Sequence, residues 1–155
     1  MKSSNRSKAL AAACASLLSV VALAGCSATV VLEPADDANN PKCAEVSVRL
    51  PSEIDQFGKR STNAQATAAW GDPTAIVLRC GLPEVEVSTL TCVSSSDIDW
   101  LVDPSKAPSY RFITFGRNPA VEVIVDSTKV SGATALDAVA AAVSQIEPTR
   151  ACTAG

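Results

Sequence analysis

The chain has 155 residues, of which 47% are hydrophobic and 4% aromatic, and its 13 basic and 16 acidic side chains give a net charge of −3. It contains no histidine, which excludes a Ser-His-Asp triad and removes the commonest general base and metal ligand. An acidic chain without a basic cluster is also a poor partner for nucleic acid.

The first 25 residues have the three parts of a secretory signal peptide. Three basic residues within the first eight positions precede an uncharged apolar run, and the small residues Ala24 and Gly25 end it. The uncharged run from 9 to 24 is 16 residues long, whereas a membrane-spanning helix needs about 20. We therefore predict that residues 1–25 are a cleaved signal peptide, with a retained transmembrane anchor as the alternative.

Leu23-Ala24-Gly25-Cys26, at the end of this run, resembles the bacterial lipobox of Leu, two small residues and Cys. The resemblance implies cleavage between Gly25 and Cys26 and acylation of the Cys26 sulfur. Two or more acyl chains anchor a protein stably in a bilayer. The implied location is the outer face of the cytoplasmic membrane, extracytoplasmic, with the lipid bilayer as a partner.

Removal of the leader would leave one acidic domain on a short tether. The leader holds three of the 13 basic residues and none of the 16 acidic ones, so the mature chain has 130 residues and a net charge of −6. Residues 26–42 are predicted to be an acidic flexible tether, because two prolines and many polar residues interrupt any apolar period. A coil of about 16 residues spans roughly 20 to 24 Å, which would hold a single globular domain, residues 43–155, just off the bilayer. The alternative is that 29–32 docks as an edge strand.

Four cysteines remain beyond the lipobox, namely Cys43, Cys80, Cys92 and Cys152. An even number in an exported domain indicates disulfides, with three possible connectivities. We expect Cys80–Cys92, bridging the ends of a short connection between two strands, and Cys43–Cys152, tying the start of the domain to its end. No metal or other cofactor is expected, because no pair has C-x-x-C spacing and histidine is absent, although four thiolates on zinc are an alternative.

The first half of the domain is predicted from local apolar patterns. Residues 43–50 are apolar at every second position, which predicts a strand. Residues 51–58 begin with Pro and end with Gly, which predicts a short helix, and 64–70 could be extended or helical. Residues 70–73 are expected to form a turn, and the β-branched run 75–81 a strand.

The second half has clearer signals. Residues 84–92 are expected to be a loop or a poor strand, and 96–102 a strand. Two further strands, 110–115 and 120–125, are joined by a hairpin at 116–119. A single apolar stripe predicts a helix from about 134 to 146.

Period two places Trp100 and Val123 toward the core, with Asp99 and Glu122 toward water. A sheet with one apolar face must cover that face. The predicted fold class is therefore α+β, a four-stranded antiparallel sheet covered on one face by helices, forming a two-layer sandwich stabilised by disulfides.

The stretches Ala68–Pro73 and Ile76–Gly81 resemble a family of actinobacterial lipoproteins, the domain of unknown function thirty-five fifteen. Further similarities are the early Cys43 followed by Leu50-Pro51, the late Asp99-Trp100, and Val121-Glu122-Val123. The likeness covers roughly residues 43 to 146. It implies a small envelope lipoprotein of uncharacterised function and supplies no catalytic residue.

The candidate metal and catalytic patterns are weak. Asp97, Asp99 and Asp103 could supply the oxygen ligands that calcium prefers, but the Gly and the distal Glu of an EF-hand loop are absent. We therefore expect these side chains to lie on a solvated face. No serine occurs in G-x-S-x-G or S-x-x-K, and no spacing favours any pair of carboxylates for hydrolysis, so no enzyme activity is expected.

Four residues are candidate ligand contacts: Trp70, Asp72, Arg79 and Arg117. An arginine on a strand can hold a carboxylate or phosphate with two hydrogen bonds. More often it pairs with an acid across the sheet, such as Glu122 or Asp99. Trp70 is more often a core ring than a ligand platform.

The expected function is that of a membrane-anchored extracytoplasmic lipoprotein, a binding or assembly module of the cell envelope with an envelope protein as partner. The alternative is a lipoprotein that binds a small molecule or peptide, and a third possibility is a histidine-free hydrolase. A pocket of several hundred Å³ with convergent polar groups would favour the alternative. A flat, exposed apolar patch would favour the assembly module.

Overall fold

The structure, a computed structural model, describes residues 28–152. The predicted signal peptide, its cleavage site at Gly25 and Cys26 and the lipidation site at Cys26 lie outside the described residues. Within residues 28–152, neither helix is long and apolar enough to cross a membrane.

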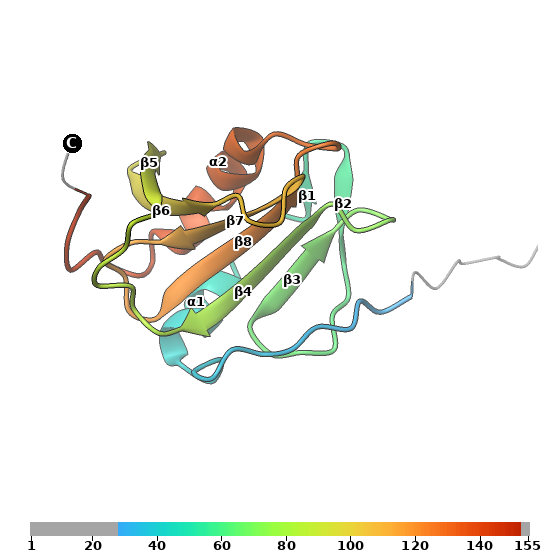
Figure 1. The fold of residues 1–155 in the computed structure, drawn as a ribbon. Helices are drawn as coiled ribbons and strands as arrows, with labels where there is room; N and C mark the ends of the chain where they lie inside the picture. Colours follow the sequence, from blue (N-terminus) through green and yellow to red (C-terminus); the bar gives the residue numbers. More distant parts are fainter. Residues whose placement is uncertain (1–27, 153–155) are drawn as a thin grey trace, which may run out of the picture.

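The architecture is one antiparallel sheet of eight strands with two short helices (Figure 1). The strands run in the spatial order β1-β2-β3-β4-β8-β7-β6-β5. Their bounds are β1 Glu53–Ile54, β2 Phe57–Arg60, β3 Thr67–Trp70, β4 Ile76–Leu82, β5 Thr91–Ser95, β6 Ile98–Asp103, β7 Ser109–Thr114 and β8 Ala120–Asp126. The helices are α1 Pro41–Ser47 and α2 Gly132–Val143.

The predicted four-stranded sheet is wrong, because the sheet has eight strands. The four predicted strands correspond to β4, β6, β7 and β8, which are six or seven residues long and rich in buried β-branched or aromatic residues. The strands β1, β2 and β5 were not predicted, and residues 64–70, which contain β3, were expected to be extended or helical. These strands have two to five residues, and β5 is largely exposed, so they carry little of the period-two signal.

Residues 41–47 form α1, not the predicted strand. The Asn40 side chain accepts a hydrogen bond from the Lys42 amide at 3.0 Å, and Pro41 occupies the first helical turn. Both features favour a helix start. The buried positions of this helix are Cys43 and Val46. They are three residues apart, which is a helical spacing, whereas the predicted strand needed every second residue to be buried.

Residues 53–60 form the β1–β2 hairpin, not the predicted helix. Ile54 pairs with Phe57 across the turn, and the intervening Asp55 has a φ of 54°. Ile54 lies on β1 and Phe57 on β2, and their pairing places both on one side of the hairpin, as a helix with the same three-residue spacing would. The turn predicted at 70–73 lies at 71–74, because Trp70 ends β3, and the connection at 116–119 lies where it was predicted.

One core joins the helices to one face of the sheet. Leu78 of β4 and Val123 of β8 belong to the same buried cluster as Val46 of α1 and Val139 of α2. In Figure 1, α1 lies behind β4 and β8. Trp100 and Val123 are fully buried, which confirms their predicted facing.

The four cysteines form two disulfides, but not the predicted pairs. The bonds are Cys43–Cys80, with Cα atoms 5.6 Å apart, and Cys92–Cys152, at 6.4 Å. Cys80 faces α1, whereas Cys92 pairs with Leu101 on the opposite face of the sheet. In addition, β8, β7 and β6 separate β4 from β5, so a Cys80–Cys92 bond would have to pass across the sheet.

The described part of the predicted tether is docked on the domain. The Val30 amide donates to Ser61 O at 2.9 Å, and Val30 forms a parallel bridge with Thr62. This arrangement resembles the alternative prediction, in which residues 29–32 dock as an edge strand. Farther along, the Asp37 amide donates to Gly81 O at 3.0 Å. Gly81 has a φ of +107°, and a Cβ there would lie 2.5 Å from the Asp37 backbone. Figure 1 shows this segment in blue, passing β3 on its way to α1.

Candidate functional site

The face of the sheet opposite the helices carries two rows of cross-strand partners. Paired residues on neighbouring strands point to the same side. The register therefore places Val77, Ile124, Arg111 and Asp103 in one row across β4, β8, β7 and β6. The adjacent row consists of Arg79, Glu122, Ile113, Leu101 and Cys92.

Two chain segments partly cover this face. The loop 83–90 crosses it at one end, where Val85 bridges to Phe115. At the other end, Leu32 and Glu33 of the docked N-terminal segment lie beside β3 and β4. The part of the face between them stays open to solvent.

Three hollows meet on this open part, with volumes of about 470, 350 and 190 Å³. Ile124 lines all three, Val77 lines two, and Arg79 and Glu122 line two. The hollows are therefore one continuous depression. We call it the open-face groove and define its floor by Val77, Arg79, Arg111, Glu122 and Ile124.

Glu122 lies at the centre of the groove floor between two arginines. Arg79 approaches one carboxylate oxygen with Nε and Nη2, each at 2.6 Å, and Arg111 Nε bonds the other oxygen. The Glu122 side chain is 3% exposed, whereas those of Arg79 and Arg111 are 31% and 36% exposed. The predicted pairing of Arg79 with Glu122 is confirmed. The prediction that Glu122 faces water is wrong, because the two arginines cover its carboxylate.

Two further charged residues, Asp103 and Lys106, lie on the rim of the groove beside Arg111. Asp103 pairs with Arg111 across β6 and β7, and Lys106 lines the same hollow. The pKa of Asp103 is lowered by hydrogen bonds from the side chain and backbone of Ser105, and then by the nearby charges of Arg111 and Lys106. Asp103 is thus ionised at neutral pH.

Trp70 and Asp72 lie away from the groove. The Trp70 ring is fully buried, and its Nε1 donates to Pro51 O at 3.1 Å, which makes it a core residue. Asp72 is exposed in the turn after β3 and forms a 3.3 Å ion pair with Arg60. Neither residue is in position to contact a ligand at the groove.

Arg117 is a buried structural cation. It lies in the β7–β8 connection, is 4% exposed, and donates through Nη1 to Ile146 O. Burial lowers its pKa, while the charges of Glu147 and Asp99 oppose this shift. Of the four predicted contact residues, only Arg79 therefore reaches the groove.

The three aspartates considered for calcium are in different places. Asp97 lies in the β5–β6 turn with a φ of 62°. Asp99 is partly buried and accepts hydrogen bonds from Ser94 Oγ and, at 2.8 Å, from the Cys152 amide. Asp103 is on the groove rim. Asp99 and Asp103 alternate with Ile98 and Trp100 and so lie on the face of β6 opposite the core, as expected, but both are partly buried and hydrogen-bonded.

One cluster of candidate metal ligands occurs among residues 28–152, formed by Cys92, Asp99 and Cys152. Its ligand atoms lie within 4.8 Å of one another, but the two sulfurs are bonded to each other. Cysteine binds a metal as a thiolate, and the sulfurs of a disulfide are not thiolates. The disulfide leaves a single carboxylate as a donor.

Arg111, Ile124 and Lys106 contribute to the groove and were not predicted. Arg111 and Ile124 lie on predicted strands, and their register with Arg79 and Glu122 places them on one face. Alternation along 110–115 and 120–125 could have indicated that face. Lys106 lies in the β6–β7 connection, for which the sequence gives no such signal.

A comparison with protein-family models matches residues 7–152 to a family described as "Protein of unknown function (DUF3515)". The match covers most of the chain, so the chain belongs to this family. It confirms the predicted family and carries no information on the lipoprotein character or the source that the resemblance implied. Neither the curated proteins nor the solved structures gave a match. Two of the motifs that carried the resemblance meet in the groove, since Arg79 pairs with Glu122.

Proposed function

We propose that this chain is a lipid-anchored extracytoplasmic protein that binds a small molecule or peptide in the open-face groove. The observation that carries the proposal is the convergence of Arg79, Arg111 and Glu122 on a hollow of about 470 Å³. Ligand sites commonly have volumes of about 300 to 1,000 Å³, with apolar walls and a few polar groups that fix orientation. Val77 and Ile124 supply apolar surface beside the charged groups.

The distribution of exposed apolar residues supports a groove more than a flat docking surface. The exposed large hydrophobic side chains among residues 28–152 are Val31, Val48, Val87 and Val93. They lie on four separate segments, namely the docked N-terminal segment, the end of α1, the loop 83–90 and β5. A partner-binding patch is usually contiguous over several hundred Å².

The lipid anchor is proposed from the lipobox alone. Cys26 follows the apolar run and small residues that precede an acylated cysteine in lipoproteins. Anchoring would keep the groove outside the cytoplasmic membrane, where disulfides form and persist. The two disulfides of the domain support an oxidising compartment.

Filling the groove tests the proposal. Full-length protein, extracted from membranes in a mild detergent, is examined by native mass spectrometry for bound small molecules or peptides. Ile124→Trp places a large ring at the position shared by the three hollows, and Val48→Trp adds the same ring on an exposed site after α1. We expect an adduct on the wild type and on Val48→Trp, and its loss from Ile124→Trp. An adduct retained equally by both variants would place the ligand elsewhere.

A further inference from the structure

We infer that the open-face groove recognises an oxyanion of its ligand, a carboxylate or phosphate group, through Arg79 and Arg111. This inference rests on the proposed function, because it assigns a ligand chemistry to the same groove. Guanidinium groups bind carboxylate and phosphate with two parallel hydrogen bonds. The two arginines are the central cations of the groove floor.

Glu122 occupies only part of the hydrogen-bonding capacity of the two arginines. Each guanidinium has five N–H donors. Within the described part of the chain, no acceptor bonds Nη1 of Arg79 or either Nη atom of Arg111. Both side chains are about one-third exposed, so their outer donors reach the solvent in the groove.

The charge of the hollow of about 470 Å³, where both arginines lie, favours an anion. One carboxylate, that of Glu122, serves two guanidinium groups. Lys106 adds a positive charge to the same hollow, and Asp103 adds a negative one. The three cations and two anions of this hollow leave it a net charge of +1, whereas Asp126 and Glu33, which line the two adjoining hollows, add two negative charges to the rest of the groove. The hydroxyl group of Ser109 also lines this hollow and is a further donor.

Glu122 acts as a positioning residue. It is buried and fixes the Nε edge of both arginines, so their Nη atoms are oriented before a ligand arrives. A preorganised site loses less conformational entropy on binding. The adjacent surface of Val77, Ile124 and Leu32 indicates a ligand whose anionic group is attached to a small apolar portion.

Such an oxyanion occurs both in soluble molecules and in anionic lipid headgroups. The probes are therefore inorganic phosphate and acetate, and vesicles of phosphatidylcholine with or without phosphatidylglycerol. The readout is the ¹⁵N–¹H resonance of the arginine Nε groups in the full-length protein, in non-ionic detergent for the soluble probes and in the vesicles for the lipid. Sodium chloride at equal ionic strength is the control for screening.

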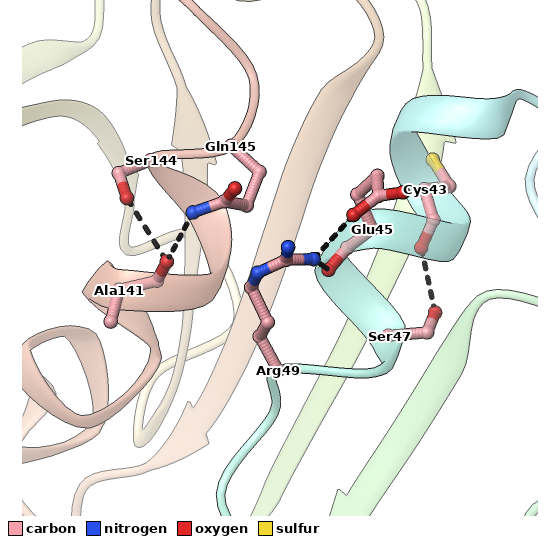
Figure 2. A network of polar contacts seen from close by, with 7 residues as sticks. All are labelled: Cys43, Glu45, Ser47, Arg49, Ala141, Ser144 and Gln145. Atoms are coloured by element: carbon pink, nitrogen blue, oxygen red, sulfur yellow. Dashed lines mark hydrogen bonds and ion pairs between the residues drawn. The ribbon is translucent and has the colours of Figure 1, made fainter.

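The matched control residue is Arg49. Figure 2 shows its ion pair with Glu45 on α1. Its side chain is 43% exposed and lies outside the groove. Arg49→Gln removes the same charge as Arg79→Gln and Arg111→Gln.

We expect a saturable shift of the Arg79 and Arg111 resonances and none at Arg49. Arg79→Gln and Arg111→Gln should each weaken binding by about 10-fold or more, as loss of a charge-assisted hydrogen bond does, and Arg49→Gln should leave it unchanged. Glu122→Gln should also weaken binding, although it removes a negative charge. A simple charge effect would strengthen it and would overturn the positioning role.

The arms of the experiment separate the outcomes. Saturation by phosphate or acetate assigns a soluble oxyanion, and a response only to phosphatidylglycerol assigns a lipid headgroup; both support the inference. No response to any probe, or equal responses in Arg79→Gln and Arg49→Gln, overturns it. If Ile124→Trp abolishes the native adduct while the arginine variants retain it, the groove binds by another chemistry and the proposed function stands.

Discussion

The Glu122 carboxylate is almost completely removed from water and lies between two guanidinium groups. Taking a charge out of water costs several kcal/mol, which only good pairing and hydrogen bonding offset. Both carboxylate oxygens are occupied. Loss of Glu122 would leave Arg79 and Arg111 close together without their shared counter-ion, so this one side chain links the stability of the sheet to the arrangement of the groove.

Glu122→Ala is therefore expected to lower the free energy of unfolding by about 2 to 4 kcal/mol. Glu45→Ala is the matched control, because it removes an exposed carboxylate paired with Arg49 and should cost no more than about 0.5 kcal/mol. Denaturant melts measure both. Equal losses for the two variants would mean that the Glu122 cluster contributes no more than a surface ion pair.

Trp100 and Asp99 are adjacent in sequence but stabilise different parts of the domain. Trp100 is fully buried in the core, and Trp100→Ala should cost about 3 to 5 kcal/mol. Asp99 holds the Cys152 amide and Ser94, so Asp99→Ala should cost about 1 to 2 kcal/mol, more than expected for a side chain in water. Urea melts of the two variants would contradict this order if Asp99→Ala were the more damaging change.

At the scale of elements, the strands with long β-branched or aromatic runs were predictable. Residues 75–81 and 120–125 have this pattern, and β4 and β8 form there. The hairpin β1–β2 and the helix α1 depend on a turn residue at positive φ and on an N-cap at Asn40. These local features decide the structure there, because the apolar pattern in each segment is too short to specify a strand or a helix.

The groove could be predicted only in part. The pairing of Arg79 with Glu122 was expected between neighbouring strands. The burial of Glu122 depends also on Arg111, which bonds its second carboxylate oxygen and was not predicted. The disulfides depend on strand order, and the order β4-β8-β7-β6-β5 separates Cys80 from Cys92. Strand order is a long-range property that local periodicity does not contain.

The attachment of α2 to the sheet gives a pH prediction. Ser95 Oγ and Ser96 Oγ donate to Asp137 Oδ1 at 2.6 and 2.8 Å, and these hydrogen bonds lower the pKa of Asp137 below 3.8. The folded state therefore favours the ionised form. This contribution to stability is present above pH 3.8 and is lost as the pH falls through the lowered folded-state pKa.

Asp137→Asn should accordingly be less stable than the wild type at neutral pH. The difference should shrink as the pH falls below 3.8, because the wild-type carboxyl then takes up a proton. Thermal melts across an acid series measure this difference. A difference that stays constant down to the acid limit would show that the charge of Asp137 has no part in holding α2.

At the scale of the whole molecule, the docked N-terminal segment sets the position of the domain. Arg60 Nη2 donates to Ala28 O at 2.6 Å, so Ala28, two residues after Cys26 in the sequence, is bonded to the domain. Two residues of extended chain span about 7 Å. With a lipid on Cys26, the domain would lie against the membrane surface and not the predicted 20 to 24 Å above it.

Anchoring should depend on Cys26. Cys26→Ala is expected to yield an uncut precursor that takes up no labelled fatty acid, because the acyl acceptor and the cleavage position are both lost. Cys14→Ala is the matched control and should be processed normally. A Cys26→Ala protein of mature size that still carries the label would refute the lipid anchor.

The central claim is that the face of the sheet opposite the helices holds the ligand. A photoactivatable diazirine residue can be placed at position 77, on the groove floor, or at position 48, exposed after α1. After irradiation of cells that produce the full-length chain, mass spectrometry of the purified protein reports what each position contacts. We expect a small-molecule or peptide adduct at position 77 and none at position 48. An adduct at position 48 alone, or at neither position, would contradict the claim.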